Sequence, residues 1–145
     1  MAKNSKKAGK KQGGSSGQNR KTGDVYLDKY RKKEGVIETS SGLLYEIVSE
    51  GDGPHPQPNA NVTVHQRAML VGGKVLDDSY KENTPMEFCL SDVIDGYAEA
   101  LQMMSVGSRY KFVVPPDLAW GKKGSGGRIG PNAVVIFDVH LLEFW

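Results

Sequence analysis

Hydrophobic and polar side chains alternate along most of the chain beyond residue 41, with the two-residue period of β-strands. The alternation is clearest in residues 62–71, where Val62, Val64 and Ala68 share one face and Thr63 lies on the opposite one. This kind of pattern predicts a sheet of five or six strands, at residues 42–50, 62–71, 74–77, 86–90, 108–114 and 134–144.

One segment departs from this period and predicts a helix. In residues 92–104, apolar side chains recur every three or four positions, which places them on one buried face. Ser91 or Asp92 is suited to cap the start of the helix, and Gly107 closes the turn after its end. Five or six antiparallel strands with one central helix predict an α+β domain.

The N-terminal segment has a different composition. Residues 1–23 carry seven Lys or Arg residues, no acidic residue, and no Val, Ile, Leu or aromatic residue. Such a segment buries too little apolar surface to offset the entropy of ordering, so we predict a disordered basic tail whose removal leaves folding almost unchanged. Two interpretations stay open: a solubilising leader, or a segment that contacts nucleic acid, the ribosome or another anionic surface.

Residues 24–41 are predicted to connect this tail to a domain at residues 42–145. Asp24 is suited to cap a short helix, and Gly35 to end it, so the connection is predicted to be a short helix and a linker. The formal net charge of the chain is +2, but the residues outside the tail carry 12 basic and 17 acidic side chains, a charge of −5.

Composition limits the classes of protein to which the chain can belong. Its 145 residues suffice for one domain. No apolar run approaches the roughly 18 residues that cross a membrane, and no apolar stretch of about 7–15 residues follows the basic N-terminus as in a signal peptide. The one cysteine, Cys89, cannot form an intramolecular disulfide, which fits a reducing compartment. We therefore expect a cytoplasmic protein without membrane contact.

The sequence contains no pattern that indicates a metal or a bound cofactor. His55, His65 and His140 are scattered without metal-ligand spacing. The glycine-rich residues 124–127 lack the Gly-Lys-Ser/Thr that opens a helix in a phosphate-binding loop. The loop at residues 121–130 is better interpreted as a mobile flap.

Four separate stretches of the chain carry recognisable motifs: VTVH to LDDS in residues 62–79, VIDGY to SVG in residues 93–107, VPPDLAWG in residues 114–121, and IGPNA to IFDV in residues 129–139. In both order and spacing, these stretches resemble the FKBP-type peptidyl-prolyl cis-trans isomerases. The bacterial branch of that family is favoured by the Ser-Gly-Leu-x-Tyr pattern at residues 41–45.

The resemblance implies a curved antiparallel sheet wrapped around one short helix, with an apolar pocket for a substrate proline between the two. It implies an isomerase, or rotamase, that acts in protein folding on proline-containing chains and accepts a macrolide ligand. The alternative is a degenerate scaffold of the same fold that binds peptides, as a chaperone module does, without catalysis.

The resemblance also implies roles for individual residues. The predicted catalytic residues are Asp77, Ile94 and Trp120. Asp77 takes the place of a polar residue of the pocket wall, and Ile94 takes the place of a residue whose backbone N–H donates to a substrate carbonyl. Trp120 takes the place of a tyrosine whose hydroxyl normally donates to the substrate. Tyr97 replaces the tryptophan usually found at the pocket floor. The predicted substrate-binding residues are Gln66, Leu76, Met86, Val93, Tyr97, Ile129 and Phe137.

Such a site needs no nucleophile, metal or cofactor. Rotation about a peptide bond crosses a barrier of about 18–20 kcal/mol because the twisted amide loses its resonance. An apolar pocket disfavours the charge-separated form of the planar amide, and tighter binding of the twisted conformer lowers the barrier further.

Several residues differ from the pattern of the family. Gln66, Leu76 and Met86 stand where aromatic residues are usual, and Glu82 lies near the place of an arginine that often partners the aspartate. We therefore expect a wider pocket, modest isomerase activity and weaker macrolide affinity.

Overall fold

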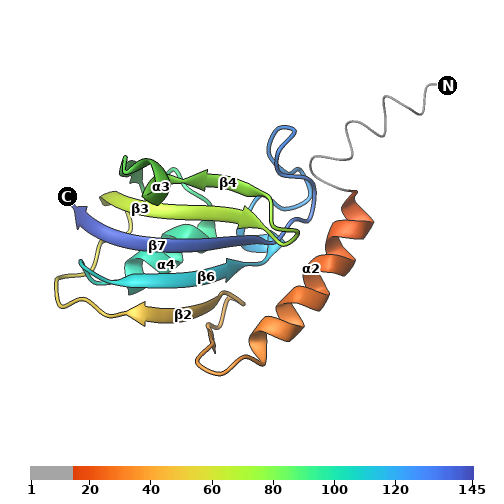
Figure 1. Ribbon diagram of the computed structural model, residues 1–145, viewed down its shortest axis with the longest axis horizontal. Helices are drawn as coiled ribbons and strands as arrows, with labels where there is room; N and C mark the ends of the chain where they lie inside the picture. Colours follow the sequence, from red (N-terminus) through yellow and green to blue (C-terminus); the bar gives the residue numbers. More distant parts are fainter. Residues whose placement is uncertain (1–14) are drawn as a thin grey trace.

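In the computed structural model, which describes residues 15–145, seven antiparallel strands form one curved sheet (Figure 1). Their order across the sheet is β1-β2-β6-β7-β3-β4, and β5 pairs with the other end of β3. The strands are β1 (Ile37–Glu38), β2 (Leu44–Ser49), β3 (Asn61–Leu70), β4 (Val75–Asp78), β5 (Met86–Cys89), β6 (Arg109–Val114) and β7 (Val135–Phe144).

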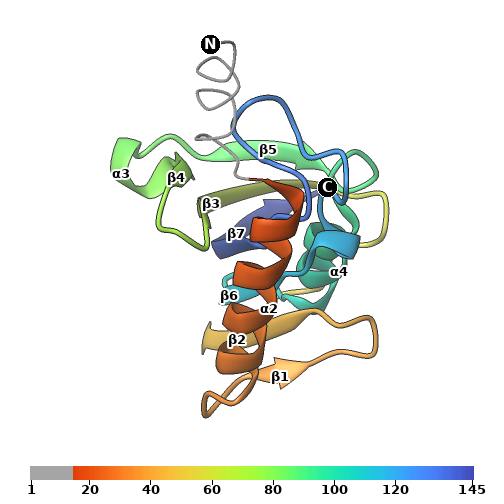
Figure 2. The ribbon, with the colours of Figure 1, turned by 90° about the vertical axis from the view of Figure 1, so that its right-hand side faces the viewer.

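Two main helices lie against opposite faces of this sheet (Figure 2). The concave face packs on α4 (Asp95–Met103), and the other face packs on α2 (Ser16–Arg31). A four-residue helix α3 (Ser79–Glu82) and a 3₁₀ turn η1 (Pro116–Leu118) complete the described elements. The predicted α+β class, with a curved antiparallel sheet around a short helix, is confirmed. The two-residue strand β1 was not predicted from the alternating pattern.

The predicted alternation is visible in the burial of β3. Val62, Val64, Gln66 and Ala68 are buried against α4, while the side chains between them are half-buried or exposed. The hairpin from β3 to β4 turns at Gly73, whose φ of +99° suits a glycine. The sheet therefore presents one apolar, concave face to the central helix.

Helix α4 packs unusually close to the sheet because its second residue is a glycine. A Cβ atom added at Gly96 would lie 2.5 Å from Val114 Cγ1. The helix begins three residues later than predicted, and its N-cap is Ile94, which makes no side-chain capping hydrogen bond. The prediction that Ser91 or Asp92 caps the helix is wrong, because the chain between them and Asp95 is extended or bent rather than helical.

Helix α2 is longer than the short helix predicted after residue 24. Ser15 caps it by accepting a hydrogen bond from the Gln18 backbone N–H at 3.1 Å. Leu27 and Tyr30 pack on the sheet face opposite to α4. Residues 15–23, which the sequence pattern assigned to the tail, thus belong to a packed helix, whereas residues 1–14 lie outside the described part of the chain.

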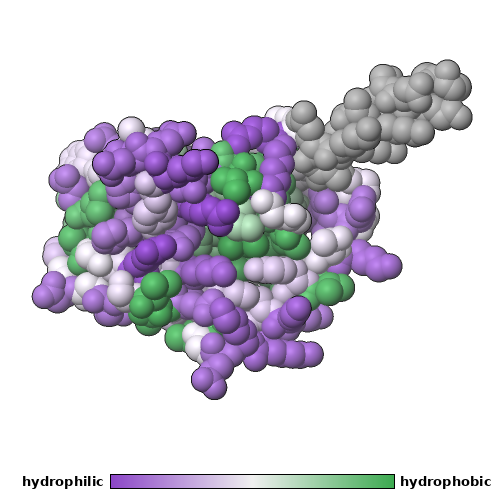
Figure 3. All heavy atoms as spheres, viewed as in Figure 1, coloured by the Kyte–Doolittle hydropathy of each residue, from purple (hydrophilic) through white to green (hydrophobic). Residues whose placement is uncertain are grey.

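Figure 3 shows a mainly hydrophilic face with hydrophobic residues in small separate groups. Isolated exposed apolar residues of this kind are normal for folded proteins. None of the helices in residues 15–145 combines the length and the apolar character needed to cross a bilayer.

Candidate functional site

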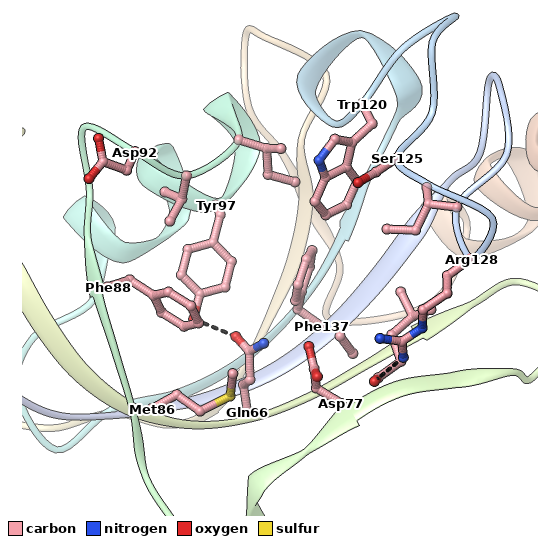
Figure 4. A pocket seen from close by; sticks show the side chains of 15 residues that line it. Gln66, Asp77, Met86, Phe88, Asp92, Tyr97, Trp120, Ser125, Arg128 and Phe137 are labelled. Atoms are coloured by element: carbon pink, nitrogen blue, oxygen red, sulfur yellow. Dashed lines mark hydrogen bonds between the residues drawn. The ribbon is translucent and has the colours of Figure 1, made fainter.

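A pocket of about 380 Å³ lies between the concave face of the sheet and α4 (Figure 4). The loop between η1 and β7 forms its remaining wall. All ten residues predicted from the sequence line this one pocket: Gln66, Leu76, Asp77, Met86, Val93, Ile94, Tyr97, Trp120, Ile129 and Phe137.

The floor of the pocket is a cluster of aromatic rings. Tyr97, on the first turn of α4, is only 3% exposed. Its ring meets Phe137 edge-on at a centroid distance of 5.1 Å, and Phe88 and Phe112 edge-on at 5.7 Å each. Edge-to-face pairs of this kind hold rings in fixed orientations. The floor is therefore a preformed, rigid apolar surface.

A hydrogen bond joins the floor to the sheet wall. The Tyr97 hydroxyl donates to Gln66 Oε1 at 2.7 Å, and burial raises the pKa of this hydroxyl, which keeps it protonated as a donor. The backbone N–H of Gln66 donates to Ser79 Oγ at 2.8 Å. Within residues 15–145, no buried side-chain nitrogen or oxygen is left without a hydrogen-bond partner.

Two of the residues that differ from the family pattern, Tyr97 and Gln66, are thus hydrogen-bonded to each other. A tyrosine in place of tryptophan brings a buried hydroxyl to the floor, and a glutamine in place of an aromatic residue accepts its hydrogen bond. The desolvation cost of placing an amide on the apolar face is offset, because the amide oxygen keeps a partner.

The start of α4 places a backbone donor beside the pocket. The Ile94 carbonyl accepts the first helical hydrogen bonds, from the N–H groups of Tyr97 and Ala98 at 3.1 Å each. Among the described residues, none accepts a hydrogen bond from the Ile94 N–H. Because this N–H lies at the positive end of the helix, it is suited to bind a carbonyl oxygen.

Asp77 supplies a carboxylate at the rim. Figure 4 shows this carboxylate pointing into the pocket between Gln66 and Arg128. Its neighbour Asp78 is engaged elsewhere, because it accepts from the Lys81 backbone N–H at 3.1 Å and lies 3.5 Å from Arg67 Nε. No ion pair within residues 15–145 involves Asp77, so its charge remains directed at the pocket.

The loop after η1 forms the flap of the pocket, which we define as residues 121–130. Ser125 and Ile129 pair through two backbone hydrogen bonds of 2.7 and 3.2 Å. Gly124 has a φ of +67°, and a Cβ there would lie 2.3 Å from the Ile129 carbonyl oxygen, so the turn requires glycine. Arg128 donates from Nη2 to the Leu76 carbonyl and thereby links the flap to β4.

Sequence reasoning missed five lining residues. Phe88 lies two positions after Met86 in a predicted strand, so the period of two was a signal for it. No sequence pattern predicted that Arg128 lines the pocket, because its position depends on how the flap folds back over β4. The five missed residues are Ala68, Phe88, Asp92, Ser125 and Arg128.

The pocket offers hydrogen-bond donors and apolar surface rather than reactive groups. Across residues 15–145, no three His, Cys, Asp or Glu side chains gather where they could hold a metal ion. The pocket can enclose an apolar ring, bind an adjacent carbonyl at Ile94, and place the Asp77 charge near the enclosed group. These are non-covalent contributions only.

Comparison with known proteins gives matches over nearly the whole chain. Residues 53–142 match the family FKBP-type peptidyl-prolyl cis-trans isomerase, and residues 1–47 match the domain amino-terminal to that isomerase. The chain is 40% identical over 143 residues to the outer membrane protein MIP of Legionella longbeachae, covering 99% of this chain and 60% of that protein.

Solved structures agree with these matches. The crystal structure of FkpA from Escherichia coli superposes with a TM-score of 0.85 at 39% identity, over 89% of this chain and 60% of that chain. A peptidyl-prolyl cis-trans isomerase from Pseudomonas syringae pv. tomato superposes with a TM-score of 0.82 at 32% identity, over 89% of this chain and 95% of that chain. The chain thus spans about 60% of the length of the Legionella relative.

These relatives overturn the expected location. The expectation of a cytoplasmic protein is wrong, because the Legionella relative is named as an outer membrane protein. The expectation rested on a single cysteine and on the lack of an apolar leader, and neither property by itself determines the compartment in which a protein works.

Proposed function

Because the chain belongs to the FKBP-type peptidyl-prolyl cis-trans isomerase family, we propose that it catalyses rotation about X–Pro bonds in unfolded or flexible polypeptides. The observation that carries the proposal is the pocket itself. Among the described residues, this site combines a rigid aromatic floor, a backbone N–H that donates to no protein acceptor, and a carboxylate that takes part in no ion pair.

The proposed reaction proceeds without a covalent step. The prolyl ring enters the pocket onto Tyr97 and Phe137, and the Ile94 N–H binds a substrate carbonyl. The apolar surroundings destabilise the charge-separated resonance form that keeps the amide planar. Asp77 lies where its charge favours the twisted amide over the planar one, so rotation in both directions becomes faster.

The remaining lining residues set the shape of the pocket. Trp120 covers the pocket from the flap side (Figure 4), and Ile129 of the flap also lines the pocket. We propose that these residues contact the side chains that flank the proline, and that Gln66, Leu76, Met86 and Val93 contact the prolyl ring. A macrolide that presents a prolyl-like ring is the second ligand class expected to enter the same pocket.

The proposal is tested by catalysed cis-to-trans conversion of Leu-Pro and Phe-Pro peptides, with refolding of a proline-limited protein as a second substrate. Acceleration by wild type, with a smaller acceleration by Asp77→Val of equal stability, supports the proposal. The family match does not favour the non-enzymatic alternative. That alternative replaces the enzyme if wild type accelerates neither reaction yet binds unfolded chains.

A second proposal concerns the basic N-terminal segment. The seven positive charges in residues 1–23 support a weak electrostatic contact with an anionic surface, nucleic acid or the ribosome. Binding of the full chain to a homopolymeric RNA, measured at low and at high ionic strength, tests this contact. Binding that is absent at low ionic strength favours the solubilising role instead.

A further inference from the structure

The N-terminal half of α2 is hydrogen-bonded to the segment that follows the flap. Asn19 Nδ2 donates to the Pro131 carbonyl at 2.9 Å, and Arg20 Nη2 donates to Asn132 Oδ1 at 3.3 Å. Asn132 Nδ2 in turn donates to Ser16 Oγ at 2.6 Å. These bonds join parts of the chain that are 112 and 116 residues apart in sequence, so they depend on the complete fold.

Asn132 also closes the base of the flap. Its backbone N–H donates to the Gly121 carbonyl at 2.8 Å, which ties the second residue after the flap to the first residue of the flap. Asn132 is 4% exposed and has a φ of +59°, a left-handed conformation that asparagine tolerates better than most residues. Asn132 thus bonds to α2 through its buried side chain and to the base of the flap through its backbone.

Close packing supports the same connection. A Cβ atom at Gly23 of α2 would lie 2.7 Å from Val134 Cγ2, so the helix backbone approaches the start of β7 directly. The flap carries Ile129 into the pocket, and its first residue follows Trp120. Helix α2 is therefore connected to the pocket through three residues. Asn132 bonds to α2 and to Gly121, and Gly121 directly follows Trp120, which lines the pocket.

We propose that the N-terminal half of α2 is a positioning element for the flap, acting through Asn132, and that it strengthens substrate binding. Elsewhere the flap is hydrogen-bonded to the rest of the domain by the backbone N–H groups of Gly121 and Gly124, which donate to the carbonyls of Pro116 and Trp120, and by Arg128, which donates to Leu76. A flap released from Asn132 samples more conformations, and ordering it on binding costs affinity. The proposal rests on the proposed isomerase function, because its kinetic readout is catalysis.

This inference differs from the expectation drawn from composition alone. Residues 1–23 were predicted to be removable with little effect, yet Ser16 and Arg20 lie within that segment and hold the flap base. Only the position of the partner residues in the fold reveals the contact.

The first test substitutes the residues of α2 that bond to Asn132, in the full chain. Ser16→Ala with Arg20→Ala removes both partners of the Asn132 side chain and leaves the flap sequence intact. We expect KM for a prolyl peptide to rise roughly threefold to tenfold, the effect of losing one or two hydrogen bonds, with kcat nearly unchanged. The matched control is Tyr30→Phe, which removes the hydrogen bond from α2 to Glu46 but touches no flap residue.

The second test changes Asn132 itself. Asn132→Gly keeps the left-handed backbone and loses the side chain, so it is expected to raise KM as the double helix variant does. Asn132→Asp retains an acceptor for Arg20 and for the Ser16 hydroxyl, and is expected to restore a KM close to wild type. Combining Asn132→Gly with the helix variant is expected to add no further change, since both cut the same link.

A spectroscopic readout separates failure of this inference from failure of the enzyme proposal. In a Trp145→Phe background Trp120 is the remaining tryptophan of the chain, and its quenching by acrylamide reports how well the flap covers it. We expect stronger quenching in the Ser16→Ala, Arg20→Ala variant than in Tyr30→Phe. Unchanged quenching and KM, or equal changes in Tyr30→Phe, overturn the inference, whereas absent catalysis in wild type overturns only the proposed function.

Discussion

The two walls of the pocket are built by different means. The wall formed by the sheet and α4 includes Gln66, Tyr97 and Phe137, each no more than 4% exposed and held by ring contacts and a buried hydrogen bond. The flap wall carries the exposed Ser125 and Arg128, and it is linked to β4 by the hydrogen bond from Arg128 to the Leu76 carbonyl. Substitutions in the first wall are therefore expected to change stability, and substitutions in the second to change binding.

The largest expected effect is on the packed wall. Phe137→Ala removes a ring that contacts both Tyr97 and Phe112, and is expected to lower the free energy of unfolding by about 3–5 kcal/mol. Urea denaturation measures this change. The matched flap variant Ser125→Ala is expected to stay within about 0.5 kcal/mol of wild type. Equal losses in the two variants would show that the flap is packed like the core.

Tyr97→Phe gives the next largest effect. It leaves Gln66 Oε1 buried without its donor, which is expected to cost about 1–3 kcal/mol of the free energy of unfolding. The double variant Gln66→Leu with Tyr97→Phe removes both partners and is expected to be more stable than Tyr97→Phe alone. A double-mutant cycle by urea denaturation measures the coupling, and strict additivity would contradict the hydrogen bond.

Asp77→Val tests a residue that belongs to a strand but is exposed at the rim. Its stability is expected to remain within about 0.5 kcal/mol of wild type, because no ion pair among the described residues is lost. Loss of the carboxylate is expected to lower kcat/KM roughly tenfold, which corresponds to about 1.4 kcal/mol in the barrier. Peptide isomerisation and thermal unfolding, measured together, decide the outcome; a large drop in Tm would instead assign Asp77 a structural role.

The smallest expected effect concerns the missing aromatic residues. Met86→Phe places a rigid ring beside the pocket in place of a flexible side chain, and is expected to tighten binding of a prolyl peptide or a macrolide roughly twofold to tenfold. The exposed neighbour Glu87→Gln serves as the control because it does not line the pocket. Gln66→Tyr is expected to help only together with Tyr97→Phe, because otherwise the Tyr97 hydroxyl loses its acceptor.

Local sequence pattern predicted the main strands of the sheet, and the family resemblance predicted ten of the fifteen residues that line the pocket. The period of two placed Val62, Val64 and Ala68 on the buried face, as observed. The order and spacing of four motifs named ten residues that meet at one pocket. The period of two follows from the geometry of a single strand, so the sequence alone carries it, whereas the ten pocket residues were predicted from the resemblance to the FKBP-type isomerases.

The tertiary structure alone decided which residues are partners. Nothing in the composition of residues 15–23 distinguishes a helix from a tail, because the contacts that use Ser16 and Arg20 are made with Asn132, more than a hundred residues away. The pairing of Tyr97 with Gln66 likewise depends on how α4 lies across β3. Periodicity determines which face of an element is buried, but the identity of a hydrogen-bond partner depends on how separate elements meet, and that is a property of the folded chain.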